Sequence, residues 1–261
     1  MKTVLTIAGS DCSGGAGIQA DLKTITVHGL YGESAITALT AQNTLGVADV
    51  MPVPPDFLEK QLECIFSDIV PDAVKLGMIP GVAQMQVILA CFEKYRPKNI
   101  VMDTVMVSTS GRNLMEPEAV TFYMEHLLPL ADVYTPNIPE TELLTGMTIR
   151  EKEQRTAAVQ KLAETYPGAV LLKGGHDENQ ADDLLFYQGK TVWFPQKHIE
   201  NSNTHGTGCT LSSAIACGLA AGLGIEESVR NAKEYITGAI ADGMNLGRGN
   251  GPLNHMYRIS K

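Results

Sequence analysis

The chain has 261 residues, of which 44% are hydrophobic and 19% charged, so it can build a sizeable globular core. Its net charge of −9 argues against a nucleic-acid partner, and no apolar run reaches membrane-spanning length, which argues against a membrane protein. The five cysteines form no C-x-x-C pair, so we expect free thiols in a reducing, cytoplasmic compartment.

Short apolar runs alternate with segments of helical periodicity along the chain. We expect strands at 3–8, 34–40, 73–78, 99–103, 132–135 and 169–173. We expect helices at 17–28, 56–69, 82–95, 117–128, 139–145, 152–166, 209–222 and 226–243. Strands rich in Val, Ile and Leu between helices predict an α/β fold with a mostly parallel central sheet flanked by helices on both faces.

The helix at 56–69 carries its own start signal. Asp56 follows two prolines and Glu59 comes three residues later, so we expect an N-cap at Asp56 with a capping box. Phe57 and Ile69 fall at helical spacing with the other apolar residues of this segment, so we expect them on its buried face.

One segment interrupts the alternation of strand and helix. Residues 183–187 and 191–194 are apolar runs on either side of Gln188-Gly189-Lys190, which predicts a β-hairpin. This hairpin, near 183–194, would extend the parallel sheet with antiparallel strands at one edge. No internal repeat or linker is visible, so we expect a single domain over residues 1–261.

Polar and glycine-bearing segments fall where the expected strands end. They are 9–11, 42–43, 75–78, 103–107, 135–137 and 173–176. In open α/β sheets, ligands bind beyond the carboxyl ends of the strands. The sequence therefore predicts one cleft shared by these segments.

The segment 203–218, NTHGTGCTLSSAIACG, has the pattern of an anion site. Gly206 and Gly208 precede a helix of small residues that we expect to begin near Cys209. Such a loop lets backbone N–H groups converge at the positive end of the helix dipole. Developing negative charge on a transferred phosphoryl group would be stabilised there.

Taken in order, these motifs carry a family resemblance. They are Thr6–Thr24, Thr40–Thr44, Lys75–Met78, Asp103–Met106, Thr135–Glu140, Lys173–His176 and Thr204–Cys209. With them, the chain from Leu5 to Pro252 resembles the hydroxymethylpyrimidine/phosphomethylpyrimidine kinases of thiamin biosynthesis, within the ribokinase-like superfamily.

That resemblance implies a ribokinase-like three-layer sandwich that uses ATP and Mg²⁺, with K⁺ left open as a further cation. It implies phosphorylation of 4-amino-5-hydroxymethyl-2-methylpyrimidine and then of the monophosphate to the diphosphate. It also implies a homodimer whose partners are otherwise only the small-molecule pyrimidine and ATP.

The expected substrate site centres on Gln42. Its amide offers a donor and an acceptor side by side, which matches an aminopyrimidine edge, and the resemblance assigns this glutamine to the pyrimidine. Asp21 either accepts hydrogen bonds from the substrate or only caps or solvates its helix. Gly9, Met78 and Val105 are expected to form the backbone and apolar walls.

The expected catalytic centre is Cys209 together with Gly206 and Gly208. Cys209 stands where many ribokinase-like sugar kinases carry an aspartate base. Because a helix N-terminus lowers the pKa of a thiol, we expect Cys209 to accept the proton of the substrate hydroxyl. The alternative is that Cys209 only positions that hydroxyl, since phosphoryl transfer through a loose transition state needs little base strength.

Asn137 and Glu140 form an Asn-x-x-Glu pattern at a strand–helix junction. In the superfamily this pattern helps to hold Mg²⁺ through water, and Asp103 is a second candidate for the metal or for phosphate. Helix capping uses the same residue types at the same spacing, so the two roles are compatible.

The remaining nucleotide contacts are expected from four residues. Lys173 follows a strand and precedes two glycines, so we expect it at the ATP phosphates. Thr204 and Thr207 flank the anion loop, and Lys233 would border the adenine.

Two other functions stay open. A pyridoxal/pyridoxine kinase of the same fold is the nearest alternative, because a thiol such as Cys209 can add reversibly to an aldehyde. A ligand sensor that has lost catalysis is the second. Many relatives also carry a lysine in the flap after Asp103 where this chain has Thr109, so a phosphate-closing role for that loop is weaker here, while Gly111 still permits a lid.

Overall fold

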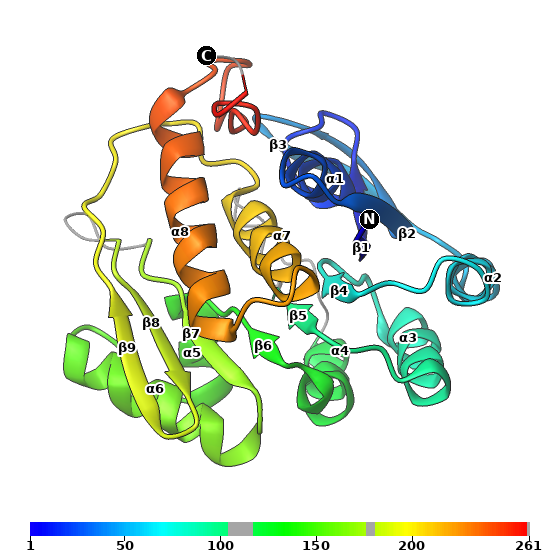
Figure 1. Ribbon diagram of the computed structural model, residues 1–261, viewed down its shortest axis with the longest axis horizontal. Coiled ribbons are helices and arrows are strands. Elements are labelled where there is room, and N and C mark those ends of the chain that lie inside the picture. The colour runs from blue at the N-terminus through cyan, green and yellow to red at the C-terminus, as the bar shows by residue number, and fades with distance from the viewer. Residues whose placement is uncertain (104–116, 176–180, 260–261) are drawn as a thin grey trace.

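The computed structural model describes residues 1–103, 117–175 and 181–259, and its centre is one nine-stranded sheet (Figure 1). The strand order is β3-β2-β1-β4-β5-β6-β7-β8-β9. The strands are β1 Thr3–Asp11, β2 Tyr31–Asn43, β3 Gly46–Pro52, β4 Ala73–Leu76, β5 Ile100–Met102, β6 Val133–Tyr134, β7 Ala169–Leu172, β8 Asp183–Tyr187 and β9 Lys190–Phe194.

The six central strands, β2 to β7 in the sheet, are parallel, and both edges are antiparallel. The β8–β9 hairpin at one edge and the mostly parallel centre confirm the predicted α/β fold. The antiparallel strand β3 at the other edge was not expected. It is largely exposed and pairs only with β2, so it lacks the apolar alternation that would reveal a half-buried strand.

One face of the sheet is covered by α1 (Gly17–Val27), α7 (Thr207–Ala220) and α8 (Ile225–Asp242), as Figure 1 shows. Helix α7 is nearly all buried because its residues are small and apolar, and it lies between the sheet and α8. Val4 of β1, Ile25 of α1 and Ile215 of α7 belong to the core on this side.

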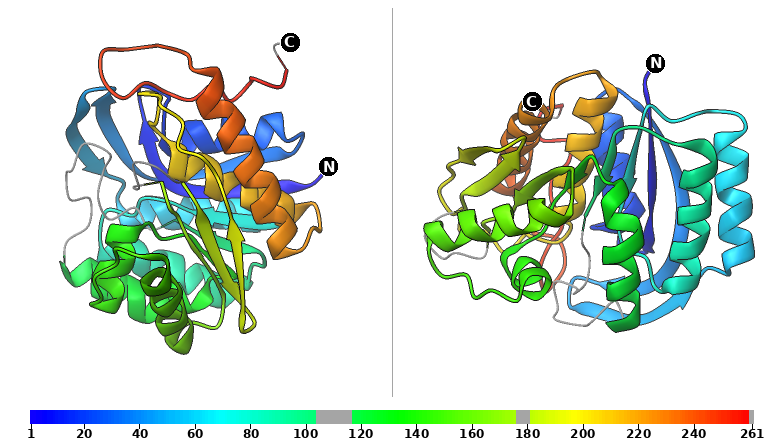
Figure 2. Two further views of the ribbon diagram at one scale, coloured as in Figure 1. Left: turned by 90° about the vertical axis from the view of Figure 1, so that its left-hand side faces the viewer. Right: turned by 90° about the horizontal axis from the view of Figure 1, so that it is seen from below.

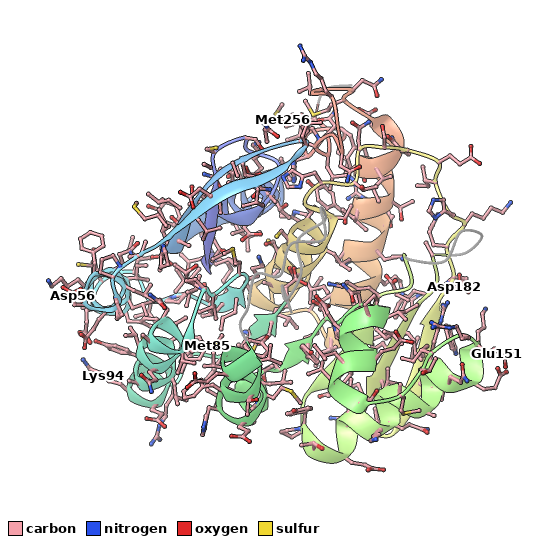
Figure 3. All side chains as sticks on the ribbon, turned by 180° about the vertical axis from the view of Figure 1, so that it is seen from behind. Asp56, Met85, Lys94, Glu151, Asp182 and Met256 are labelled. Atoms are coloured by element: carbon pink, nitrogen blue, oxygen red, sulfur yellow. The ribbon has the colours of Figure 1, made fainter. Side chains whose placement is uncertain are left out.

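The opposite face carries the other helices: α2 Pro55–Phe66, α3 Val82–Tyr95, α4 Pro117–Phe122, α5 Ile138–Thr145 and α6 Lys152–Thr165. Leu5 and Ile7 of β1 point into this second core, while Val4 points into the first, as strand alternation requires. Figure 2 shows the two helix layers on opposite sides of the sheet. In Figure 3, Asp56 and Lys94 mark one end of the second layer and Glu151 the other.

Helix ends differ from the sequence predictions in two places. Helix α2 begins at Pro55 with Pro54 as N-cap and no side-chain cap, so the predicted cap at Asp56 is wrong; Phe57 and Ile69 are also exposed. The segment expected as one helix at 117–128 is a six-residue α-helix followed by a π turn at Tyr123–Leu127. Within the described part of the chain, no helix is both long and apolar enough to cross a membrane.

The chain enters the sheet at β1 and continues to β2 on one side and to β4 on the other. The carboxyl ends of these parallel strands lie at the same edge, and the start of α7 faces them from the first layer. Open α/β sheets bind ligands at such a change of direction.

Candidate active site

A cavity of about 620 Å³ lies beyond the carboxyl ends of the parallel strands. Nearly all of the predicted site residues line it: Gly9, Gln42, Met78, Asp103, Asn137, Glu140, Lys173, Thr204, Gly206, Thr207, Gly208, Cys209 and Lys233. Val105, Thr109 and Gly111 lie outside the described residues. The prediction of one shared cleft is therefore confirmed for the segments that the structure describes.

The glycine loop before α7 has the backbone that an anion site needs. Gly206 is the N-cap of α7 with φ of 84°, and a Cβ there would collide with the Gly15 carbonyl. A Cβ at Gly208 would lie 3.1 Å from Asp103 Oδ2 and 3.5 Å from Lys173 Nζ. The N–H groups of the first turn of a helix have no partner within the helix, so this end of α7 can receive an anion on the side of Lys173.

Asp103 and Lys173 form an ion pair at this end of the cavity. Lys173 Nζ donates to Asp103 Oδ1 at 2.8 Å, and the side chains are 16% and 3% exposed, respectively. Burial raises the pKa of Asp103, but the charges of Lys173 and Lys75 outweigh it and hold the pKa below its usual value. The lysine is thus a fixed positive charge that a ligand in the cavity can reach.

Asn137 and Glu140 form the capping box of α5 and also line the cavity. The Glu140 N–H donates to Asn137 Oδ1 and the Asn137 N–H donates to Glu140 Oε2, both at 2.8 Å. In the described part of the chain no three His, Cys, Asp or Glu residues cluster closely enough to hold a metal by themselves. The Asp103 and Glu140 carboxylates, which both line the cavity, still fit Mg²⁺, which usually takes one or two carboxylates plus phosphate and water.

Asp21 does not line the cavity, so the structure supports neither of its two expected roles, contact with the substrate or capping and solvation of its helix. Its side chain is 0% exposed and accepts from Lys75 Nζ at 2.9 Å and from Thr6 Oγ1 at 2.6 Å. Ser213 Oγ of α7 donates to its other oxygen at 2.8 Å. These partners saturate the carboxylate, so Asp21 joins α1, β1, β4 and α7 inside the protein.

Lys75 is the positive half of this buried pair, and its structural role was not predicted from the sequence. Burial on its own lowers the pKa of Lys75, but the Asp21 carboxylate outweighs it and keeps the amine protonated. A lysine inside a strand that is otherwise apolar, Ala73–Leu76, was the sequence signal that could have revealed it.

The Cys209 thiol is protonated at neutral pH, which corrects the expectation of a thiolate. Its pKa is raised to about 11: burial is the largest cause, the carboxylates of Asp21 and Asp103 add to it, and the Lys75 charge acts in the opposite direction. The helix N-terminus and one positive charge do not outweigh two carboxylates and the loss of water. Cys209 therefore faces the cavity as a neutral thiol.

Gln42 lies at the end of β2, where its side chain contacts His205, which in turn contacts Asp11; the sequence did not single out either residue. Gln42 Nε2 is 3.0 Å from His205 Nε2, and His205 Nε2 is 2.8 Å from Asp11 Oδ2. Cys12 Sγ contacts the Gln42 backbone at 3.1 Å from the carbonyl and 3.3 Å from the nitrogen. Asp11 ends β1 and His205 lies inside the anion motif, so their positions in known motifs were the available signals.

Lys233 on α8 lies at the cavity rim with its amine already engaged. Its Nζ donates to Asp183 Oδ2 at 2.7 Å and to the Ala181 carbonyl at 2.6 Å. These contacts join α8 to the start of β8. A nucleotide base against this wall would meet the aliphatic stem of Lys233 rather than a free charge.

Comparison with known proteins assigns this architecture to a family. The family model described as phosphomethylpyrimidine kinase matches residues 11–254. The chain is 48% identical over 260 residues to the hydroxymethylpyrimidine/phosphomethylpyrimidine kinase of Rhizobium meliloti, covering 97% of both proteins. It is 49% identical over 255 residues to the thiamine biosynthesis bifunctional protein ThiED of Geobacter sulfurreducens, where 97% of this chain spans 52% of that protein.

Solved structures agree with this assignment. The phosphomethylpyrimidine kinase of Clostridium difficile 630 superposes with a TM-score of 0.83 at 44% identity, over 92% of this chain and 100% of that one. The pyridoxal kinase of Staphylococcus aureus in complex with AMP-PCP and pyridoxal gives a TM-score of 0.90 at 34% identity, over 99% and 96%. The higher structural score thus goes with the lower identity, so overall fold does not separate the two substrate classes.

Proposed function

The chain belongs to the phosphomethylpyrimidine kinase family and is a phosphotransferase, and from that premise we propose its substrates. The enzyme transfers the γ-phosphoryl group of ATP to 4-amino-5-hydroxymethyl-2-methylpyrimidine and then phosphorylates the monophosphate to the diphosphate. One observation carries this proposal: the same cavity holds the Gln42 amide and, by α7, the Asp103–Lys173 pair with the glycine loop. A site for an aminopyrimidine edge and a site for a phosphoryl group therefore share one space.

Different residues of the chain stabilise charge and orient the acceptor hydroxyl in the transfer step. Backbone N–H groups at the start of α7 and the Lys173 ammonium stabilise negative charge on the transferred group, in a position fixed before the reaction. The neutral Cys209 thiol and the Gly9 backbone border the acceptor hydroxyl. Because the transition state is loose, orientation of that hydroxyl matters more than a strong base, and a thiol with a pKa of about 11 is suited to orienting it.

Mg²⁺ would be held from Asp103 and, through water, from the Asn137–Glu140 junction. The ion supplies charge neutralisation along the ATP phosphates when it is bound. The Asp103 carboxylate is ionised, since Lys173 and Lys75 keep its pKa low, and so it can face a cation at neutral pH. The proposal includes K⁺ as a second cation beside Mg²⁺.

A pyridoxal kinase is the second candidate, and Cys209 is the residue that favours it. A cavity-lining thiol can add to an aldehyde carbonyl, and the Staphylococcus aureus relative binds pyridoxal. Gln42 favours the pyrimidine, because its amide matches a ring nitrogen beside an exocyclic amine.

The organisation of the protein completes the proposal. One sheet runs from Thr3 to Phe194 and α7 and α8 cover it, which supports a single kinase domain over residues 1–261. Five free cysteines support a reducing, cytoplasmic location. Exposed apolar side chains on β2 and β3, such as Leu39 and Met51, support a homodimer through this edge.

The test is ADP release with Mg-ATP and, in separate assays, hydroxymethylpyrimidine, its monophosphate, pyridoxal and pyridoxine. We expect turnover of both pyrimidines with a higher kcat/KM than for either vitamin B6 compound. A preference for pyridoxal reassigns the acceptor and leaves the phosphoryl-transfer site as it stands.

The substrate role of Gln42 is tested by Gln42→Leu. Leucine fills the space but offers no donor or acceptor, so the substrate edge loses its partners and the KM for the pyrimidine should rise about tenfold or more. The KM for ATP should change less than about twofold. Equal effects on both constants would mean that Gln42 only supports the site.

A further inference from the structure

The orientation of the Gln42 side-chain amide conflicts with the hydrogen positions of its two neighbours, His205 and Thr40. Its Nε2 lies 3.0 Å from His205 Nε2, and its Oε1 lies 3.3 Å from Thr40 Oγ1. An amide NH₂ is only a donor and an amide oxygen only an acceptor. This orientation is therefore satisfied only if His205 Nε2 accepts and Thr40 Oγ1 donates.

Asp11 decides what His205 Nε2 can do. Asp11 Oδ2 is 2.8 Å from that nitrogen, and the carboxylate also accepts from the backbone of Gly15 and Ala16 and from Ser13. Burial raises the pKa of Asp11, but the hydrogen bonds from His205 and Ser13 outweigh it and hold the pKa below its usual range. An ionised carboxylate at 2.8 Å requires a proton on His205 Nε2, whether or not Nδ1 is protonated too.

The Thr40 hydroxyl leads to the same conclusion independently. It has one proton, and the Ser10 carbonyl at 3.0 Å accepts it. Its oxygen then faces Gln42 with lone pairs. Both neighbours of Gln42 thus call for the amide with its two ends exchanged, so that Nε2 donates to Thr40 and Oε1 shares the single His205 Nε2 proton with Asp11 Oδ2 in a three-centre hydrogen bond.

We propose that Asp11 and His205 are specificity-determining positioning residues. They hold the Gln42 amide with its oxygen toward His205 and its NH₂ toward Thr40, and so fix which end donates to the substrate. One N–H and one oxygen lone pair remain free for the ligand. A 4-aminopyrimidine presents an amine donor beside a ring-nitrogen acceptor, whereas the 4-oxo analogue presents the reverse order. A locked amide accepts one order and rejects the other; a freely rotating amide accepts both. This inference rests on the proposed function for its substrate, but not for its proton positions.

The proton positions are tested by ¹⁵N NMR on protein labelled in its six histidine rings, with the His205 signals assigned from a variant. We expect a protonated, pyrrole-type Nε2 in His205 in the absence of substrate. An unprotonated, pyridine-type Nε2 would overturn the proposal. This result does not depend on any catalytic activity.

The substrate consequence is tested by the ratio of kcat/KM for the 4-amino pyrimidine to that for its 4-oxo analogue. His205→Leu removes the N–H. We expect the ratio to fall about tenfold, which corresponds to the loss of one hydrogen bond that distinguishes the two substrates. His205→Gln is the matched variant: its amide can donate to Asp11 and Gln42, so the ratio should stay within about threefold of the wild type. A general loss of activity in a variant lowers kcat/KM for both substrates by the same factor, so it cancels in the ratio.

A second pair of variants covers failure of His205→Leu to fold. Thr40→Val removes the oxygen that accepts from Gln42 and should lower the same ratio, while Thr40→Ser keeps it. An unchanged ratio in folded His205→Leu, or in Thr40→Val where His205→Leu does not fold, overturns the proposal. If the wild type turns over neither pyrimidine, the proposed function fails, and the NMR measurement alone decides the proton arrangement.

Discussion

Two lysine–carboxylate pairs lie within the same part of this protein and differ in what surrounds them. Asp21–Lys75 is 0% exposed on both sides and is closed off by Thr6 and Ser213. Asp103–Lys173 has nearly the same geometry, 2.8 against 2.9 Å, but opens onto the cavity. The pair with no access to the cavity connects elements of the fold, and the accessible pair is the one that we propose takes part in the transfer step, although sequence alone marks all four residues as equally polar.

The largest expected effect comes from removing the lysine charge of the buried Asp21–Lys75 pair. Lys75→Met leaves Asp21 buried without its cation, so the free energy of unfolding should fall by about 3–5 kcal/mol in urea titrations. Lys94→Met is the matched control, because Lys94 pairs with Glu63 on the surface at 2.6 Å and exposed pairs contribute little to stability. Similar losses in the two variants would remove the distinction between a closed and an exposed pair.

The accessible pair should respond in activity. Lys173→Met removes the ammonium beside the anion loop, and we expect kcat/KM to fall about 10²–10³-fold, as for the loss of one preorganised charge-stabilising group. The loss of stability should be smaller than in Lys75→Met, because water from the cavity can reach Asp103. Lys173→Arg keeps the charge and should retain more activity. A stable variant with wild-type kinetics would place Lys173 outside the transfer step.

Cys209 lies between the two pairs and should show a smaller effect. Since its pKa is about 11, the thiol is protonated at pH 7, and Cys209→Ser should lower kcat by less than about tenfold. Alkylation of Cys209, followed by mass spectrometry of its peptide, should speed up as the pH rises toward 11. A rate that is already constant between pH 7 and 9 would show a thiolate and restore Cys209 as a base.

The smallest effect concerns a carboxylate without a lysine. Glu33 Oε2 is buried with no hydrogen-bond partner among the described residues, and burial together with the Asp68 charge raises its pKa to about 7. Its usual value is 4.5, so the fold favours the protonated form and stability falls as the pH rises from 4.5 to about 7. Glu33→Gln should therefore raise the Tm at pH 8 more than at pH 4.5 in calorimetric scans. The opposite order would contradict burial as the cause.

Much of the fold could be predicted from the sequence because its signals are local. Apolar runs separated by helical periodicity located the central strands, and Gln188-Gly189, both with positive φ, marked the hairpin turn. Strand β3 could not be predicted, because its pairing with β2 depends on backbone contacts and none of its residues is buried.

For the site, position was predictable and environment was not. Strand-end and glycine motifs placed Asp103, Lys173 and Cys209 together, since parallel strands end at one edge. Whether a carboxylate faces the cavity or the core, as for Asp21, depends on helix rotation and on a partner 54 residues away. The thiol pKa was predicted in the wrong direction for the same reason: it reflects the sum of burial and charges from three other elements.

The contact between Asp11 and His205 also has a consequence for biosynthesis. The two residues are 194 positions apart, so this cavity joins the first strand of the chain to the loop before α7. During translation, β1 and the Gln42 strand leave the ribosome long before α7, and closing so large a loop is slow compared with local helix formation. The newly made chain therefore acquires its recognition surface among the last steps of folding, and truncated products carry the sheet edge without the pocket.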